Sequence, residues 1–488
     1  MKKIFINRIG RREFLKTSLS GLVLATLPRI SFAQSNPDVV VIGAGSSGLA
    51  ATAELMRRGI SFVCIEGMNR IGGRCYTDTT SFSGLPADHG AHWLHARKGN
   101  ELYQFGMENK DKFKIYKEPS TSVVYDGKKK VSGSTFWHVY KKIKDIYGDG
   151  GIDEPLMNKI PEKLKKNIWF DTAHAAITAR DFDNISIADD SLNYEDSYWE
   201  SGNALCREGY GTLLAYYRKD VPVKLNTIVS EIKWGGKGVQ VVTNKGTIKA
   251  KACIVTTSVG VLRAEKIKFS PKLSPRKYEA FEGITMGTSN RVIMELKKKF
   301  VGKFKKDTNF YSKIDSNGAK SPEGIGYGLL KMGGTNLCLF ALNGEFSRSL
   351  ENQGSQAMID FVVNELKSNF GSKFYDKYFV KALATGWNKN PFTLGAYSGA
   401  IPGKAGLRPR LKRPVGDRIF FAGEATAGAY GTVHGANRSG MRAATDVYIS
   451  PALDQNLNGL PLAFSISLPS QTIAFPFIIV PKGKPFTS

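Results

Sequence analysis

A short apolar run followed by three closely spaced glycines restricts the fold of this chain more than any other feature of its sequence. Val39–Ile42 consists of β-branched residues, and the loop after it has glycine at positions 43, 45 and 48. Residues 47–58 then carry apolar side chains at helical spacing. We therefore predict a strand, a tight turn and a helix in that order, as at the start of a parallel βαβ unit.

Each glycine of this loop has a separate physical role in a dinucleotide site. Gly43 permits the tight turn, Gly45 lets the backbone approach a pyrophosphate, and Gly48 allows the helix to pack closely. The helix begins near Ser47, and its N terminus favours the negative charge of the phosphates. We therefore take Gly43, Gly45, Ser47 and Gly48 as cofactor-binding candidates.

The acidic residue expected of such a site is also present. Gly59 ends the helix, residues 60–65 form the predicted second strand, and Glu66 closes it at the usual distance of about 20 residues. A carboxylate there binds a ribose hydroxyl and disfavours a 2′-phosphate. The glycines alone also fit an ordinary tight turn, but strand, helix, second strand and Glu66 together favour a dinucleotide site.

Six further segments, in order along the chain, carry a family resemblance. They are 67–74 (GMNRIGGR), 88–95 (DHGAHWLH), 208–211 (EGYG), 254–263 (IVTTSVGVLR), 420–426 (FFAGEAT) and 432–436 (TVHGA). In this order and spacing they resemble the flavin amine oxidase family from about residue 38 to residue 448. One departure is Ser258, which stands where the family usually has proline. The resemblance implies an FAD cofactor, with Gly73 and Arg74 in a second phosphate loop.

The resemblance also implies the fold, an α/β architecture in which a Rossmann-like FAD-binding domain is interleaved with an α+β substrate-binding domain. We expect the FAD-binding domain to be discontinuous, with segments 37–95, 206–270 and 400–450. The substrate-binding domain then takes 96–205 and 271–399. Its second segment predicts strands alternating with helices, for example a strand at Leu337–Leu342 and a helix at Gln356–Phe370.

Within the family, the segment Gly395-Ala396-Tyr397-Ser398 resembles polyamine oxidases and lysine-specific histone demethylases. Monoamine oxidases have a cysteine before the tyrosine that bonds the flavin, whereas Ala396 has no sulfur, so FAD is expected to be non-covalent. Thr432 stands where monoamine oxidases have a second cage tyrosine. The resemblance thus implies one aromatic wall, Tyr397, with the small Thr432 opposite, which leaves room for a long, thin substrate.

The remaining site residues follow from the same resemblance. His95 is implied to line the cavity, Gly423 and Glu424 to belong to the cofactor site with Glu424 at the ribityl chain, and the Val433-His434 backbone to serve the flavin pyrimidine. The cofactor performs the difficult step, hydride transfer from the carbon beside nitrogen to flavin N5, so the protein positions and desolvates the amine. The imine product hydrolyses in water, and oxygen takes the electrons with release of hydrogen peroxide. No metal is needed.

One position departs from the family in a way that concerns reoxidation. After Gly287-Thr288-Ser289-Asn290 the family usually has a lysine that holds a water at flavin N5, and this chain has Arg291. Arginine stays protonated in proteins and is bulkier and forked. Slow use of oxygen or a different electron acceptor is one consequence. A tolerated swap that preserves the charge is the other interpretation, and we favour it.

The N terminus predicts export. Arg11 and Arg12 precede the apolar stretch Leu19–Leu27, and Ser31-Phe32-Ala33 forms a small-x-small cleavage site. This is the pattern of a twin-arginine signal peptide over residues 1–33, and its apolar stretch is too short to span a membrane. We therefore expect the twin-arginine export machinery as a partner and a periplasmic or secreted enzyme.

The tail, 451–488, lies outside the resemblance, and prolines interrupt its apolar run, so we expect no stable membrane span there.

The chain is strongly basic, with a net charge of +26. Its lysines lie in scattered short clusters and no nucleic-acid-binding motif is visible, so no nucleic-acid partner is expected. The charge fits a cationic substrate poorly unless the pocket itself is acidic, which gives weight to anionic or zwitterionic amines. The acidic stretch Asp181–Glu200 is interpreted as a solvated surface loop. Five cysteines without CxxC spacing imply no disulfide framework.

Three functions therefore stay open. The first is FAD-dependent oxidation of a polyamine or another alkyl amine, favoured by Tyr397, Thr432 and His95. The second is an L-amino-acid oxidase, which needs a cation in the cavity for the substrate carboxylate, with Arg291 or Arg438 as candidates. The third is a flavin-binding protein or isomerase without oxidase turnover, motivated by Arg291.

Overall fold

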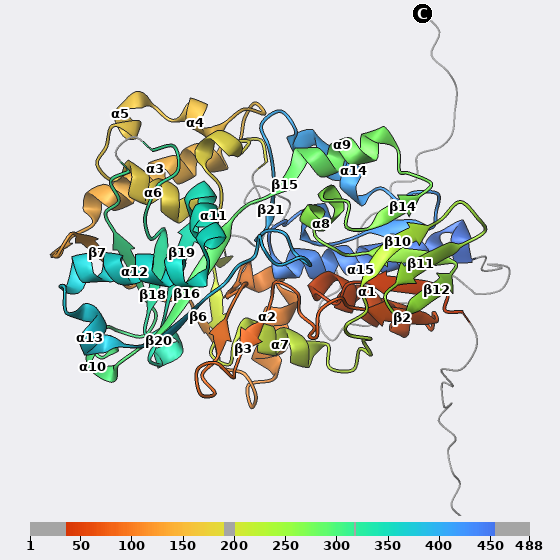
Figure 1. Ribbon diagram of the computed structural model, residues 1–488, viewed down its shortest axis with the longest axis horizontal. Helices are drawn as coiled ribbons and strands as arrows, with labels where there is room; N and C mark the ends of the chain where they lie inside the picture. Colours follow the sequence, from red (N-terminus) through yellow and green to blue (C-terminus); the bar gives the residue numbers. More distant parts are fainter. Residues whose placement is uncertain (1–35, 190–200, 317–318, 454–488) are drawn as a thin grey trace, which may run out of the picture.

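The computed structural model of the chain describes residues 36–189, 201–316 and 319–453. The predicted signal peptide, most of the tail and the second half of the acidic stretch lie outside the described residues. The described chain forms two lobes (Figure 1), one around a small parallel sheet and the other around a large mixed sheet. No helix within these described ranges is long and apolar enough to cross a membrane.

The nucleotide-binding lobe is built on a four-stranded parallel sheet. Its order is β2 (Phe62–Ile65), β1 (Val39–Ile42), β13 (Ala252–Val255) and β22 (Ile419–Phe421). Every residue of β1 and β13 is buried, as expected for parallel strands covered on both faces. The predicted Rossmann-like fold is confirmed, although the second strand begins at Phe62 and is shorter than the predicted 60–65.

The side chains of β1 point alternately to the two faces of the parallel sheet and pack in two different hydrophobic cores. This strand therefore lies at the centre of the lobe. Val39 and Val41 pack with the helices on one face. Val40 and Ile42 pack on the other face with a second, mostly antiparallel sheet. The strands of that sheet are, in order, β12 (Gly246–Ala250), β11 (Val239–Thr243), β10 (Val229–Lys233) and β14 (Lys268–Ser270).

Two helices lie against each other beside the parallel sheet, α1 (Ser46–Arg57) and α15 (Val433–Ile449). Their contact depends on small residues, because a Cβ on Gly440 would lie 2.0 Å from the Ser47 carbonyl oxygen. At the start of both helices, Ser46 Oγ donates to the Val433 carbonyl oxygen at 2.9 Å. The glycine loop is thus fastened to a helix that begins 387 residues further along the chain.

The second lobe is built on a seven-stranded mixed sheet. The strand order is β20 (Phe379–Ala384), β16 (Ser289–Leu296), β19 (Leu337–Asn343), β18 (Tyr327–Leu330), β17 (Thr308–Ser312), β7 (Ser122–Asp126) and β8 (Lys129–Val131). Helix α12 (Ser355–Phe370) contacts β16 and β20, and α6 (Phe170–Ile177) contacts β19. The strand predicted near Leu337 and the helix predicted after Gln356 are both confirmed.

A buried ion pair joins distant parts of the chain. Arg408 begins α14 (Arg408–Lys412), and its Nε and Nη2 donate to the Asp189 carboxylate at 2.5 and 2.8 Å. The two side chains are 5% and 0% exposed. The Ala400 amide also donates to Asp189, while Arg408 Nη1 donates to Ser398 Oγ and to the Ala425 carbonyl oxygen. The pair therefore holds the segment after α6 against the segments on either side of α14.

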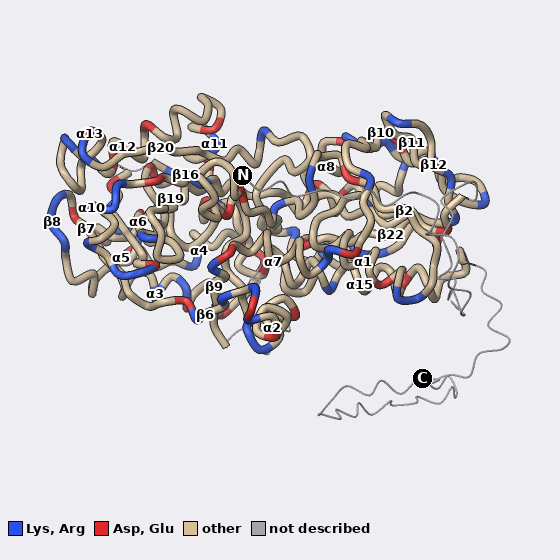
Figure 2. Tube along the Cα trace, turned by 90° about the horizontal axis from the view of Figure 1, so that it is seen from below, with Lys and Arg blue, Asp and Glu red and all other residues tan. Residues whose placement is uncertain are grey.

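Charged residues of both signs occur along the chain in both lobes (Figure 2). Lysine and arginine positions alternate with aspartate and glutamate positions in each lobe. The five cysteines are free and buried, so packing rather than cross-linking stabilises the fold.

Candidate active site

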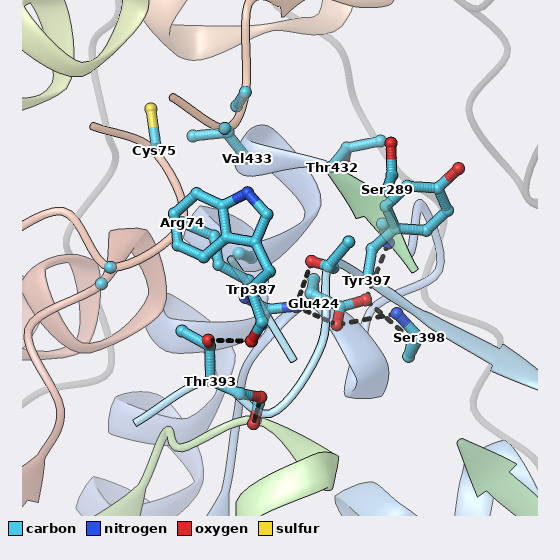
Figure 3. Close-up of a pocket in the computed structure, with 18 of the residues that line it drawn as sticks. Arg74, Cys75, Ser289, Trp387, Thr393, Tyr397, Ser398, Glu424, Thr432 and Val433 are labelled. Carbon is cyan, nitrogen blue, oxygen red and sulfur yellow. Dashed lines mark hydrogen bonds and ion pairs between the residues drawn. The ribbon is translucent and has the colours of Figure 1, made fainter. Parts of the chain in front are cut away.

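A continuous cavity of about 930 Å³ is lined by residues of both lobes. Figure 3 shows part of it, where Trp387, Tyr397, Glu424 and Thr432 come together. The wall contains every predicted site residue except Gly48 and His434, namely Gly43, Gly45, Ser47, Glu66, Gly73, Arg74, His95, Arg291, Tyr397, Gly423, Glu424, Thr432 and Val433. The structure therefore brings together residues that are spread over almost four hundred positions of the sequence.

The two residues outside the wall lie directly behind it. A Cβ on Gly48 would lie 1.8 Å from the Gly43 carbonyl oxygen, so this glycine lets α1 pack under the loop. His434 follows Val433 in the first turn of α15 and is 1% exposed. A contact between the His434 backbone and the flavin stays a prediction.

The nucleotide end of the cavity has the features that FAD requires. A Cβ on Gly45 would meet no atom within 4 Å, so bare backbone at the N terminus of α1 faces the cavity. Beyond β2, Glu66 accepts hydrogen bonds from the Ala44 amide at 2.7 Å and the Met68 amide at 2.9 Å. Burial raises the pKa of Glu66, and these amides act against that rise. A helix N terminus that is open to phosphate, with a fixed carboxylate nearby, fits a dinucleotide cofactor.

Glu424 is the centre of a hydrogen-bond cluster between the two ends of the cavity (Figure 3). Its carboxylate accepts from Arg74 Nη1 at 2.9 Å, from Ser398 Oγ at 2.7 Å, and from the Ser398 and Gly431 amides at 3.1 and 2.9 Å. Burial opposes the charge, but Arg74 and Ser398 hold the pKa of Glu424 below its ordinary value. Protein donors thus occupy much of its accepting capacity. Glu424 positions Arg74 and the segment after Tyr397, while its predicted contact with the ribityl chain stays a prediction.

Tyr397 is fixed at both its ring and its backbone. Its hydroxyl accepts from the Ala179 amide at 2.9 Å, and its carbonyl oxygen accepts from the Gly287 amide at 2.8 Å. Burial raises the pKa of Tyr397, so the phenol is neutral at neutral pH. Thr432 caps α15, because its Oγ1 accepts from the Gly435 amide at 3.0 Å and donates to the Ala429 carbonyl oxygen. The Thr432 hydroxyl therefore has a structural role in addition to lining the cavity.

His95 belongs to a chain of polar side chains that ends at a carboxylate. Its Nδ1 lies 2.8 Å from Asn203 Oδ1, and Asn203 Nδ2 donates to Glu118 at 2.8 Å. Since the amide oxygen can only accept, His95 Nδ1 carries the proton in this arrangement. Trp93 Nε1 donates to the other oxygen of Glu118 at 2.7 Å. Burial lowers the pKa of His95, which keeps the ring neutral at physiological pH.

Arg291 lies in the cavity wall, near the start of β16, the strand next to the edge strand β20 of the large sheet. Its Nη1 donates to the Asp88 carbonyl oxygen at 3.1 Å, and its guanidinium lies 5.5 Å from the centre of the Trp93 ring. Burial lowers the pKa of Arg291 to about 10, so the group stays charged. Arg438, the other cation considered for a substrate carboxylate, is outside the cavity wall and bonds Glu101 and Gly99 instead. The suggestion that Arg438 binds substrate is therefore wrong.

Several wall residues carried no signal in the sequence. Glu118, Asn203, Lys144 and Arg180 line the cavity but stand outside every motif. The predicted single aromatic residue, Tyr397, is joined in the wall by eight others, Trp93, Tyr140, Tyr147, Tyr311, Tyr327, Trp387, Phe392 and Tyr430.

Ser258, at the usual proline position, caps α8 (Val259–Arg263) through its Oγ and donates to the Thr393 carbonyl oxygen. In the part of the chain that the structure describes, no group of three or more His, Cys, Asp or Glu side chains is placed to hold a metal.

The fold and the site define a class of protein, a dinucleotide-binding enzyme in which the nucleotide site opens into an aromatic cavity. Comparison with known families agrees with this class. Residues 188–448 match the model of the flavin containing amine oxidoreductases, and residues 41–106 match an NAD(P)-binding Rossmann-like domain. The chain belongs to the flavin-containing amine oxidoreductase family. It is an FAD-dependent amine oxidase, and Ala396 offers no sulfur for a covalent link to the cofactor.

Individual relatives support the same assignment. The chain is 29% identical to polyamine oxidase 4 of Oryza sativa subsp. japonica, over 88% of this chain and 92% of the relative. It is 28% identical to polyamine oxidase 2 of Arabidopsis thaliana, over 84% and 88%. Among solved structures, a putrescine oxidase variant superposes with a TM-score of 0.66 at 19% identity, covering 84% of this chain and 99% of that one. At this identity the superposition establishes the fold alone.

Proposed function

We propose that this protein oxidises the carbon–nitrogen bond of a polyamine or another alkyl amine to an imine. The observation that carries the proposal is Glu118, a carboxylate in the same cavity wall as Tyr397 and held by Trp93 and Asn203. A carboxylate fixed there offers a partner for a second ammonium group of the substrate. The relatives named polyamine oxidase, and a putrescine oxidase structure bound to putrescine, support the same class of substrate.

The side chains divide the work between orientation and desolvation. When bound, FAD supplies the acceptor for the hydride that leaves the carbon beside nitrogen. The neutral ring of Tyr397 orients the reacting amine, and Thr432 leaves space opposite it. The neutral His95 accepts or donates hydrogen bonds without adding a positive charge that would repel the amine. The aromatic wall excludes water from the reacting atoms.

Oxygen is the electron acceptor in this proposal, with hydrogen peroxide as the second product. Arg291 keeps a positive charge in the wall, as a lysine would, and the charge-preserving interpretation of this position rests on that observation.

We further propose that the chain is exported by the twin-arginine pathway, because Arg11-Arg12 and the apolar stretch after it form the expected signal. Retention of the protein in the cytoplasm after Arg11→Lys and Arg12→Lys tests the route; unchanged export would exclude it.

The decisive experiment is anaerobic bleaching of the flavin absorbance in the purified protein. Putrescine, spermidine, spermine, aromatic monoamines and L-amino acids are added in turn, and air is then admitted to measure peroxide. Reduction by an alkyl amine followed by peroxide formation supports the proposal. A flavin that none of these compounds reduces contradicts it and favours a flavoprotein without oxidase turnover.

Replacing Glu118 by glutamine should weaken the binding of diamines selectively. The substitution keeps the size of the side chain but removes the charge that faces a second ammonium, so we expect the KM for putrescine to rise about tenfold or more. Butylamine, which has the same carbon chain and one amine, is the matched control and should change little. Equal losses for putrescine and butylamine would show that Glu118 acts only through Asn203 and Trp93.

A further inference from the structure

A buried carboxylate outside the cavity wall, Glu351, is the centre of a second hydrogen-bond cluster. It lies in the last turn of α11 (Gly344–Gln353) and is 2% exposed. Its Oε2 accepts from the side-chain amides of Asn290 and Asn388 at 2.8 and 2.6 Å, and its Oε1 accepts from the Lys389 amide at 2.8 Å. Two of these donors lie in the loop after β20, and the third lies in β16.

The position of this carboxylate is unfavourable for the helix that carries it. The C-terminal end of a helix has a partial negative charge, which repels a carboxylate in the last turn. Burial adds the cost of removing water from the charge. The three donors are neutral N–H groups, and each makes a stronger hydrogen bond to a charged acceptor than to a neutral one. The carboxylate is therefore explained by the segments that donate to it and not by the stability of α11.

Asn290 connects this carboxylate to the cavity. Its buried side chain donates to Glu351 through Nδ2, and its Oδ1 accepts from the Trp387 amide at 3.1 Å. The next residue, Arg291, is paired with the same loop, because its amide donates to Thr385 Oγ1 at 2.8 Å and its carbonyl oxygen accepts from the Thr385 amide at 2.9 Å. One amide side chain thus links Glu351 to the backbone of Trp387, beside the strand that carries Arg291.

Trp387 is the cavity residue that this cluster holds. Figure 3 shows its indole among the side chains that line the cavity. Its carbonyl oxygen accepts from Thr393 Oγ1 at 2.9 Å and from the Gly395 amide at 2.8 Å, so the same backbone fixes the turn that leads to Tyr397. A displacement of about 1 Å in a residue that orients a substrate lowers the rate by up to about 100-fold, because the reacting atoms lose their alignment.

We propose that Glu351 is a positioning residue, which sets the place of the Trp387 indole in the cavity through Asn290 and the loop after β20. The kinetic consequence rests on the proposed amine oxidation, whereas the position of the indole can be measured without it. Glutamine at position 351 would keep the size of the side chain. Its NH2 group would face an N–H donor in either orientation of the amide, so the cluster could not form as it stands.

Fluorine NMR of the protein labelled with 5-fluorotryptophan measures the indole position directly. The chain has six tryptophans, and Trp387→Phe identifies the Trp387 signal. We expect Glu351→Gln to shift or broaden that signal and to leave the Trp234 signal, from the nucleotide-binding lobe, unchanged. Glu345→Gln is the matched control, since this carboxylate of the same helix is 56% exposed, and it should change neither signal. An unchanged Trp387 signal in Glu351→Gln would overturn the inference.

Anaerobic rapid mixing of the flavin-loaded protein with an alkyl amine measures the kinetic consequence. We expect Glu351→Gln to lower the rate constant of flavin reduction at saturating amine about 10- to 100-fold. Trp387→Phe should lower it as well, and the double variant should be no slower than Trp387→Phe, because both changes act through one indole. Effects that multiply in the double variant would contradict the inference, as would a wild-type rate in either single variant.

Two further outcomes are covered by the same measurements. If Glu351→Gln fails to fold, Asn388→Ala takes its place, because it removes one of the three donors and leaves the contact between Asn290 and Glu351 intact. It should move the Trp387 signal to a smaller extent, and an unmoved signal counts against the inference. If no amine reduces the wild-type flavin, the proposed function fails, while the fluorine signal still decides whether Glu351 positions Trp387.

Discussion

Replacing Arg408 by methionine is expected to lower the free energy of unfolding by about 3–5 kcal/mol. The substitution leaves the Asp189 carboxylate buried without its cation, at a side chain that is 0% exposed. It also removes the donors to Ser398 Oγ and to the Ala425 carbonyl oxygen. Breaking one partner of a buried pair is costly because the remaining charge stays desolvated.

Urea denaturation followed by tryptophan fluorescence measures this effect, with refolding checked on dilution. Arg263→Met is the matched control, since the Arg263–Glu282 pair is 49% and 60% exposed and should contribute at most about 1 kcal/mol. A similar change in both variants would mean that water reaches the Arg408–Asp189 pair. The control also shows whether loss of a positive charge alone changes stability in this basic protein.

Gly48→Ala is expected to give a protein that purifies without FAD. The added Cβ would lie 1.8 Å from the Gly43 carbonyl oxygen, a distance that real Cβ atoms do not reach, so the loop or the start of α1 must move. Such a shift moves the backbone that faces the phosphates by a large part of an ångström, and helix N-terminal binding depends on that geometry. The ratio of flavin to protein absorbance in the purified variant measures the loss.

The control for this variant is Gly236→Ala. Gly236 lies between β10 and β11, and a Cβ there would meet no atom within 4 Å. This substitution should leave the flavin content at the wild-type level. Full flavin content in Gly48→Ala would show that the loop tolerates displacement and that its glycine spacing is not required for the cofactor.

The nucleotide-binding part of the fold could be predicted because its requirements are local. The β-branched run before Gly43, the glycine spacing and Glu66 each satisfy a backbone or charge requirement within about 30 residues, so one stretch of sequence carries all of them. The strand near Leu337 and the helix after Gln356 were predictable for the same reason, since each has its own periodic pattern. The cysteine argument likewise needed only composition and spacing.

The substrate end could not be predicted in the same way, since its residues are related only through the tertiary fold. Glu118 and Asn203 lie on either side of a long stretch of sequence and meet because the chain returns to the same place. Glu351 is a single glutamate near the end of a helix, and only its burial and its three donors distinguish it from a surface residue. Arg438 shows the opposite error, because a charged residue that follows a site motif can bond elsewhere and lie outside the cavity wall.

The fastening of the glycine loop to α15 has a consequence for biogenesis. Until β22 and α15 have been synthesised, the growing chain lacks one strand of the parallel sheet. It also lacks the helix whose Val433 carbonyl oxygen accepts from Ser46. Long-range pairings of this kind form late, after synthesis of nearly the whole polypeptide. FAD binding therefore requires the completed fold. The ratio of flavin to protein in a preparation then reports the fraction of fully folded molecules, and truncated or misfolded chains should bind no flavin.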